Sequence, residues 1–231
     1  MKGIMSVFKR RPAPTAPSFW HDLQPPEAIY AIGDVHGRRD LLAAMEAVLA
    51  QDWAQRSYGD VVLLYLGDLI DRGPHSAHVL DHLTAPAPKG VRRLTLLGNH
   101  EEMFLAFVDR PEANMAWLDH GGDETLNSYG IYLTKSEIAG MPRSKVLQHL
   151  RASIPRPHLD ALRRAPRAVR SGGARLGDLD GHDLGHACGG AGCGSRRLDH
   201  ARNSARDVGA PRCLARGSGL NVCAASCHGS L

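Results

Sequence analysis

The chain has 231 residues, of which 43% are hydrophobic and 23% are charged, as in ordinary globular proteins. No apolar run approaches the roughly 20 residues that a bilayer-spanning helix needs, so we expect no membrane partner. The formal net charge is +4, and residues 163–231 sum to +6 through 11 Arg and five Asp, without Lys or Glu. This basic part has no aromatic side chains to stack on bases and no recognisable binding module, so we also expect no nucleic-acid partner.

The N-terminus is basic but lacks the apolar stretch and the small-residue cleavage site of a secretory signal. Its Pro and Ala content is typical of a flexible segment. We therefore interpret residues 1–25 as a flexible lead-in and expect a cytoplasmic protein.

Residues 28–33 (AIYAIG) form a short apolar run that ends in Gly, and they predict a buried strand. Apolar residues then recur at helical spacing, which predicts an amphipathic helix ending near Ala54. These residues are Leu41, Leu42, Met45, Val48 and Leu49. A second apolar run, residues 61–67 (VVLLYLG), predicts the second strand.

Ser76 is predicted to cap a helix that carries Val79, Leu80 and Leu83. Residues 94–98 (LTLLG) predict a third strand, and residues 101–108 a helix with acidic residues in its first turn. The resulting order is β-α-β-α-β, which implies parallel strands joined by right-handed crossovers.

A polar string follows each predicted strand: GDVHG at 33–37, GDLIDRG at 67–73 and GNHE at 98–101. Ligands of α/β sheets gather at the carboxyl ends of the strands, so these loops should meet along one edge. The side chains brought there are Asp34, His36, Asp68, Asp71, Arg72, Asn99 and His100. Carboxylates and imidazoles suit divalent ions such as Mn, Fe or Zn. The competing interpretation is that each string is an ordinary turn between a strand and a helix.

The three strings match the pattern GDxHG, GDxxDRG and GNHE, and the chain thereby resembles the metallophosphoesterase (calcineurin-like) superfamily. Within it, the chain is similar to the bacterial and phage-type serine/threonine protein phosphatases, which are related to symmetrical diadenosine tetraphosphatases. The stretch WLDHGGDETLNSYG at 117–130 resembles a W…GG…T…YG stretch of bacterial members. The resemblance implies an α/β fold, the calcineurin-like metallophosphatase β-sandwich flanked by helices, with only its N-terminal half present at residues 26–162.

The resemblance also implies roles for the site residues. Two divalent metal ions are expected, Mn first, with Fe or Zn as alternatives. Their ligands would be Asp34 and His36 for the first ion, Asp68 as the bridge, and Asn99 for the second ion. His100 would be the general acid, with Asp71 holding its ring. Arg72 would bind the phosphoryl oxygens, with His100 and Asn99 beside it.

The implied function is metal-dependent hydrolysis of phosphoserine or phosphothreonine monoesters by attack of a metal-bridging hydroxide. The partner is then a phosphoprotein or a small phosphorylated substrate. Two alternatives stay open. One is a symmetrical bis(5'-nucleosyl)-tetraphosphate hydrolase, because the same motifs serve both reactions, and the other is a catalytically impaired remnant with an incomplete second metal site.

Several residues near the motifs have simpler interpretations. Asp71 and Arg72 could form only an ion pair that closes a turn. We expect surface or packing roles for His75, His78 and His82, and a loop role for His120. Glu101 and Glu102 are expected to favour a helix N-terminus rather than to bind metal.

Residues 163–231 differ in composition from the rest of the chain. They contain no aromatic residue, Ile or Lys, but all five Cys. This composition is typical of a disordered segment. No C-x-x-C pair is present, so we interpret the cysteines as incidental thiols rather than a zinc site.

This segment also lacks the two later histidine motifs of the superfamily, which resemble VHAG and GHT. His182 and His186 are poor substitutes, because no apolar strand precedes them. We hypothesise that residues from about 163–170 onward are translated in a shifted reading frame of a GC-rich gene, and the alternative is a genuinely divergent tail. The nucleotide sequence around codons 160–175 tests this, and the hypothesis fails if the neighbouring frame does not encode the two missing motifs.

Overall fold

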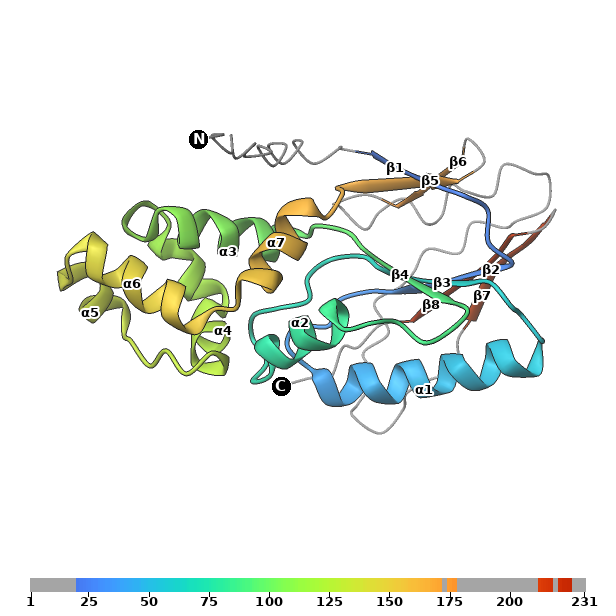
Figure 1. Ribbon diagram of the computed structural model, residues 1–231, viewed down its shortest axis with the longest axis horizontal. Coiled ribbons are helices and arrows are strands. Elements are labelled where there is room, and N and C mark those ends of the chain that lie inside the picture. The colour runs from blue at the N-terminus through green and yellow to red at the C-terminus, as the bar shows by residue number, and fades with distance from the viewer. Residues whose placement is uncertain (1–19, 172–173, 178–211, 218–219, 226–231) are drawn as a thin grey trace, which may run out of the picture.

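A computed structural model describes residues 20–171, 174–177, 212–217 and 220–225 of the chain (Figure 1). The larger of its two sheets has the strand order β4-β3-β2-β8-β7. Its strands are β2 (Ala28–Ile32), β3 (Val61–Tyr65), β4 (Val91–Thr95), β7 (Arg212–Gly217) and β8 (Leu220–Ala225). The pairs β2–β3, β3–β4 and β2–β8 are parallel, and β7 runs antiparallel to β8.

The predicted β-α-β-α-β order is confirmed for the N-terminal part. The helix α1 (Arg39–Gln55) connects β2 to β3, and α2 (Ser76–Thr84) lies between β3 and β4. Figure 1 shows both helices on the same side of the larger sheet.

The strands β2 and β3 are buried along their whole length, and their alternating side chains contribute to two separate cores. The face that packs against α1 and α2 carries Tyr30, Ile32, Leu63 and Tyr65. The opposite face carries Ile29, Val62 and Leu64. Two-sided burial explains why these strands are continuous apolar runs rather than alternating ones.

The second core lies between the larger sheet and a smaller one. The smaller sheet has the order β1-β5-β6, with β1 (Trp20–Leu23), β5 (Ala168–Ser171) and β6 (Ala174–Gly177). Leu23 and Val169 from its strands pack with the apolar face of the larger sheet. Figure 1 shows the smaller sheet on the side away from α1, so the two sheets form the expected sandwich.

Among the strands that lie outside the predicted domain bounds 26–162, β1 and β5 pair with each other. The strand β1 falls within the predicted lead-in, and β5 falls within the predicted atypical segment. They pair in parallel, with Trp20 opposite Ala168. Each is only four residues long, so neither has enough length to display a periodic pattern.

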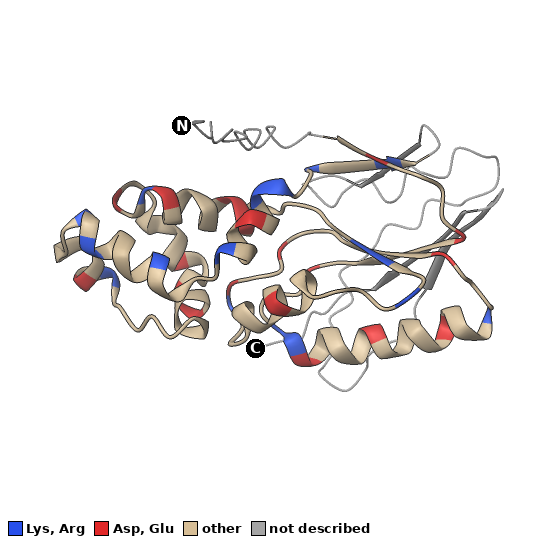
Figure 2. Ribbon diagram, in the orientation of Figure 1, with Lys and Arg blue, Asp and Glu red and all other residues tan. Residues whose placement is uncertain are grey.

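A group of helices lies beyond one end of the sheets (Figure 1). It consists of α3 (Asn99–Asp109), α4 (Gly122–Ser128), α5 (Lys135–Gly140), α6 (Arg143–Ser153) and α7 (Arg156–Arg164), with short 3-10 helices η1 (Pro111–Ala113) and η2 (Met115–His120). Figure 2 shows basic and acidic residues interspersed along the ribbon of this group. Ion pairs between its elements include Arg163–Asp109 at 2.6 Å and Arg143–Glu112 at 3.4 Å.

Two predictions about local structure were wrong. The helix α2 begins at Ser76 itself, and its N-cap residue is His75. The Ser76 hydroxyl does not cap the helix but accepts a hydrogen bond from the Asp71 amide. The third strand is Val91–Thr95 rather than 94–98. Its start was missed because Arg92 and Arg93 interrupt the apolar pattern, while Leu96 and Leu97 are buried beyond the strand.

Parts of the predicted disordered segment are strands in the structure, namely β5 to β8. The remaining residues of that segment, including His182 and His186, lie outside the described residues, as do residues 1–19 of the lead-in. In the part of the chain that the structure describes, no helix is long and apolar enough to cross a membrane.

Candidate metal centre

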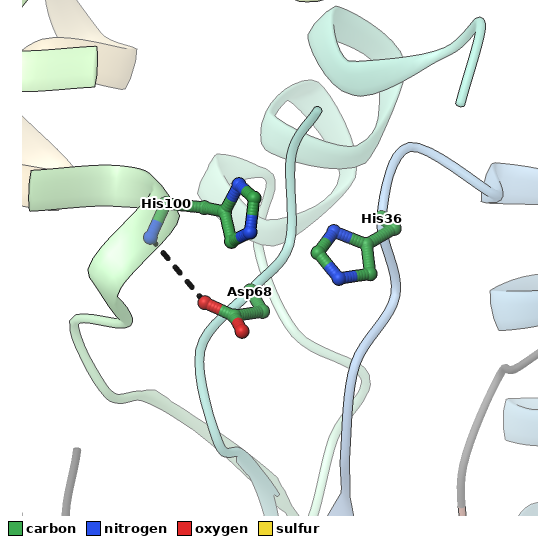
Figure 3. A group of neighbouring side chains, drawn as sticks. All are labelled: His36, Asp68 and His100. Atoms are coloured by element: carbon green, nitrogen blue, oxygen red, sulfur yellow. Dashed lines mark hydrogen bonds between the residues drawn. The ribbon is translucent and has the colours of Figure 1, made fainter. Parts of the chain in front are cut away.

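The three motif loops meet at the carboxyl edge of β2, β3 and β4. His36 follows β2, Asp68 follows β3, and His100 lies in the first turn of α3 after β4. One potential ligand atom of each lies within 4.8 Å of the others, and Figure 3 shows the three side chains directed at a common space. Within the described ranges this is the only cluster of three or more potential metal ligands of the His, Cys, Asp and Glu types. The predicted convergence of the loops is therefore observed.

The backbone of these loops adopts the left-handed conformation at non-glycine residues. The φ angles are 43° at His36, 49° at Asp68, 71° at Asp71 and 65° at Arg72. Such angles are unfavourable for residues with a Cβ and persist only where the surroundings impose them. Four of the five such residues in the described chain lie in the motif loops, so strain is concentrated at this edge.

Backbone hydrogen bonds tie the first loop to the second. The amides of Val35 and His36 both donate to the Asp68 carbonyl, at 3.0 and 2.9 Å, and Gly37 donates to the Leu69 carbonyl at 2.8 Å. A Cβ at Gly37 would lie 2.6 Å from the Gly73 carbonyl oxygen. Glycine is therefore required there for the two loops to approach.

The Glu101 carboxylate ties the second loop to the third. It is fully buried and accepts hydrogen bonds from the amides of Asp68 at 2.9 Å, Leu69 at 2.8 Å and Gly98 at 2.9 Å. Burial, with the nearby charge of Asp68, raises the pKa of Glu101 to about 7. Its predicted role at the helix N-terminus is confirmed by the bond to Gly98, and the structure adds the contact to the loop after β3.

The two imidazoles present their Nε2 atoms to the same guanidinium. Arg72 donates to His36 Nε2 at 2.9 Å and to His100 Nε2 at 3.2 Å. His36 Nδ1 lies 2.9 Å from the Ile70 carbonyl, which can only accept, so Nδ1 carries the proton and the Nε2 lone pair faces the site. Burial lowers the pKa of His36, and the neighbouring charges of Arg72 and His100 lower it further, which keeps the ring in the neutral form that binds metals.

His100 is held from its other nitrogen by Asp71. The Nδ1–Oδ2 distance is 2.7 Å, and both side chains are buried, with Asp71 0% exposed. Burial disfavours the charged form of His100, but the hydrogen bond and the charge of Asp71 outweigh it and raise the pKa of this histidine. Because the carboxylate pairs with His100, the alternative of a simple Asp71–Arg72 ion pair that closes a turn is wrong.

The remaining predicted ligands lie beside this cluster. The Asn99 amide, with its nitrogen turned toward Asp68, donates to that carboxylate at 3.0 and 3.2 Å. Asp34 lies two residues after β2 and is half-buried, outside the group of three.

This set of donors fits a divalent first-row metal ion. It combines His36 Nε2, which carries a defined lone pair, with the Asp68 carboxylate, and the Asn99 amide and the His100 ring are adjacent. The Arg72 guanidinium contacts the Nε2 atoms of both His36 and His100 in this structure. An ion bound to His36 Nε2 therefore requires Arg72 to release that ring.

The sequence model of the calcineurin-like phosphoesterase family matches residues 28–174, more than half of the chain. The chain belongs to this family. The match covers all three motif loops.

Two curated proteins are similar to part of the chain. Serine/threonine-protein phosphatase 2 of Escherichia coli (strain K12) is 37% identical over 97 residues, which are 41% of this chain and 38% of that protein. An uncharacterized protein of Schizosaccharomyces pombe (strain 972 / ATCC 24843) is 37% identical over 89 residues, which are 34% of this chain and 26% of that protein. The chain thus spans about a third of the length of these relatives.

Among solved structures, the chain is similar to the crystal structure of a provisionally assigned diadenosine tetraphosphatase. The sequence identity is 20%, the TM-score is 0.35, and the match covers 63% of this chain and 50% of the other.

The other histidines near the motifs lie where surface or packing roles were expected. His75 and His78 are exposed and contact each other edge to face at 5.7 Å between ring centroids. His82 is half-buried and bonds to Glu46 at 2.8 Å. His120 is exposed at the end of η2.

Residue-by-residue reasoning missed the side chains that surround Asp71. Its carboxylate accepts hydrogen bonds from Trp117 Nε1 and from Thr125 Oγ1, both at 2.7 Å. These residues belong to the stretch at 117–130 that resembled the bacterial members. That stretch was the one signal in the sequence that pointed to them.

Proposed function

We propose that this chain is a metal-dependent phosphoesterase that hydrolyses phosphoserine and phosphothreonine monoesters. The observation that carries the proposal is the convergence of His36, Asp68 and His100 around the Arg72 guanidinium. Similarity to a serine/threonine-protein phosphatase supports a phosphoprotein, or a small phosphorylated molecule, as the substrate.

Asp34, His36, Asp68 and Asn99 would hold two divalent ions, with Mn as the first choice and Fe or Zn as alternatives. When bound, such ions supply an activated water and neutralise charge that develops on the phosphoryl group. The carboxylates, the amide and the imidazole are the ligand types that these ions accept.

Arg72 would bind the phosphoryl oxygens. Arg72 is exposed, and its two terminal nitrogens each contact one acceptor, as they would contact two oxygens of a phosphate. We propose that the guanidinium exchanges the two imidazoles for the phosphate when substrate and metal bind. Asn99 lies beside Asp68, and its amide would contact the phosphate together with Arg72.

His100 would protonate the leaving oxygen from Nε2. The Asp71 carboxylate on Nδ1 fixes the ring orientation and favours the protonated form, and Nε2 faces the space that the guanidinium occupies. A proton donor placed in this way contributes about 10²- to 10⁴-fold to rate. The loss of one proton from Nε2 would leave the ring still held by Asp71.

The second metal site would have fewer ligands than the superfamily pattern provides. The superfamily pattern places two later histidines on that ion, and no matching motif was found in the sequence. Asp68 and Asn99 would then be its ligands in this chain, and an incomplete shell should weaken binding of the second ion. The remnant with one metal site is therefore the main rival.

The test is an assay of the purified chain after chelation and then with added Mn²⁺. Substrates are a phosphothreonine peptide, an aryl phosphate and diadenosine tetraphosphate, and bound metal is counted by elemental analysis. Asp68→Asn removes a ligand charge. Asp60→Asn is the matched control, because Asp60 pairs with Arg92 on the surface at 2.9 Å.

We expect Mn²⁺-dependent cleavage of the phosphopeptide that Asp68→Asn abolishes and Asp60→Asn preserves. Cleavage of diadenosine tetraphosphate alone would replace the proposed substrate by the alternative one. One bound ion per chain without turnover on any substrate would overturn the enzyme proposal in favour of the remnant.

A further inference from the structure

The segment Trp117–Thr125 contacts Asp71 and Arg72. In the proposed function, Asp71 holds the His100 ring and Arg72 binds the phosphoryl oxygens. The segment comprises the end of η2, the turn at Gly121 and the start of α4. The segment lies about 50 residues further along the chain, so only the tertiary fold brings the two together.

The first set of contacts holds the Asp71 carboxylate at both oxygens. Oδ2 accepts from His100 Nδ1 and from Trp117 Nε1, each at 2.7 Å, and Oδ1 accepts from Thr125 Oγ1 at 2.7 Å. The Trp117 indole is 2% exposed and Thr125 is fully buried. Water therefore has little access to replace either donor.

The second set of contacts holds the backbone. The Asp71 amide donates to Thr125 Oγ1 at 2.9 Å, and the Arg72 amide donates to the Gly121 carbonyl at 3.1 Å. Both Asp71 and Arg72 have positive φ, and these bonds offset the cost of that conformation.

Close packing leaves no room for a Cβ at either glycine of the turn. At Gly121 a Cβ would lie 2.5 Å from the Arg72 amide nitrogen, and at Gly122 it would lie 2.5 Å from the Trp117 ring. Gly121 also has φ of +93°. The two glycines thus let the turn approach Arg72 and keep the indole in place.

We propose that Trp117 and Thr125 are positioning residues, which act through Asp71 to fix the orientation of the His100 ring. The expected effect on rate rests on the proposed function, whereas the orientation of His100 by these residues does not depend on it. A carboxylate held at both oxygens cannot rotate about its Cβ–Cγ bond, so the ring bonded to it keeps Nε2 directed at the site. The loss of either donor frees that rotation and leaves the cluster of His36 and Asp68 untouched.

Matched variants remove one donor at a time. Thr125→Val deletes the hydroxyl, while Thr125→Ser retains it. Trp117→Phe deletes the indole N–H, and Trp53→Phe is its control, because Trp53 packs on Tyr30 near the far end of α1. If Trp117→Phe does not fold, 3-benzothienylalanine at position 117 replaces the N–H by sulfur and keeps the ring size.

The first readout needs neither metal nor turnover. In proton NMR of the metal-free protein, the Nδ1–H of His100 in its short bond to Asp71 should give a slowly exchanging downfield signal, assigned by its absence in His100→Gln. We expect this signal to be lost in Thr125→Val and in the position-117 variants, and to be present in Thr125→Ser and Trp53→Phe. An unchanged signal in the folded donor-deleting variants would overturn the proposal.

The second readout separates positioning of a proton donor from general damage. A leaving group that needs protonation should suffer more, so kcat for phenyl phosphate should fall about 10- to 100-fold and kcat for 2,4-dinitrophenyl phosphate less than about threefold. KM should change little in either case. Equal losses for both esters would indicate a merely structural role and overturn the inference about rate.

The two proposals fail in different ways. If the unmodified chain shows no turnover with any metal, the proposed function fails, and the NMR signal still decides whether Trp117 and Thr125 orient His100. If turnover is observed but the variants behave like their controls, the proposed function stands and the positioning role is lost.

Discussion

Among the described residues, two Asp–His pairs have the same residue types but different surroundings. In the candidate site, His100 lies 2.7 Å from Asp71, and where α7 meets α2, His158 lies 3.1 Å from Asp81. Both histidines are only 3% exposed, but Asp71 is 0% exposed and Asp81 is 62% exposed. The burial of the carboxylate is thus the main difference between them.

The pKa values of the two histidines are shifted in opposite directions. Burial lowers the pKa of His158, and the solvated Asp81 does not offset it, whereas Asp71 outweighs burial and raises the pKa of His100. Water screens a charge that it can reach, so a carboxylate must be enclosed to control its partner. Trp117 and Thr125 offset the cost of burying the Asp71 carboxylate, because they donate hydrogen bonds to its oxygens.

The largest expected effect is the loss of the enclosed carboxylate. Asp71→Ala leaves His100, Trp117 and Thr125 without their acceptor in a buried place, and removing one partner of a buried pair costs about 3–5 kcal/mol. The free energy of unfolding, measured by urea titration of the metal-free protein, should fall by that amount. A loss below about 1 kcal/mol would mean that the enclosed pair is not the more strongly coupled of the two.

His158 should make the protein less stable in mild acid. Its folded pKa is lowered below the unfolded value, so the unfolded state takes up the proton first as the pH falls. Stability is therefore retained above the unfolded pKa, near 6.5, and lost as the pH falls from there through the folded pKa. Protonation would also remove the lone pair of Nδ1, which bonds to the Tyr129 hydroxyl.

The measurement is the free energy of unfolding of the metal-free protein between pH 7 and pH 5. His158→Gln retains a donor for Asp81 and an acceptor for Tyr129 but does not titrate, so its stability should decrease less steeply. Equal slopes for the two proteins would contradict this.

A smaller effect is expected from the Tyr129 hydroxyl, which bonds to His158 Nδ1 at 2.9 Å. Tyr129→Phe leaves that nitrogen unpaired, at a cost of about 1 kcal/mol. Tyr132→Phe is the matched control, because Tyr132 is 77% exposed and should show no change. Thermal and urea unfolding of the two variants give the comparison, and equal stabilities would count against the bond.

The smallest effect is expected for the solvated carboxylate. Asp81→Asn keeps an acceptor for His158 and removes a screened charge, and exposed pairs contribute about 0–1 kcal/mol. The free energy of unfolding should therefore change by less than about 1 kcal/mol. A change as large as that for Asp71→Ala would remove the distinction between the two pairs.

The metal-ligand candidates could be predicted because their signals are local. Apolar runs such as 28–32 and 61–65 mark buried strands, and the polar strings after them must meet at the carboxyl edge of a parallel sheet. His36, Asp68 and His100 converge for that reason. The chain order of strand, loop and helix is enough for this step, because the direction of each parallel strand follows from the crossover.

The partners of those residues could not be predicted in the same way. Trp117 and Thr125 bond to Asp71 although they lie 46 and 54 residues further along the chain. The strands β1 and β5 pair although Trp20 and Ala168 are far apart in the sequence. Nothing in the period or the spacing of those residues specifies such contacts, since they depend on how the helices and sheets pack.

The amino-acid pattern alone was thus sufficient for the strands β2 and β3, the three motif loops, and the types of donor at their edge. The tertiary structure decided that Asp71 is buried and that Asp81 is exposed. It thereby also decided whether the pKa of each histidine is raised or lowered. The physical reason is that residue type and local periodicity are properties of neighbouring positions. Dielectric environment and hydrogen-bond partners are properties of the packed whole.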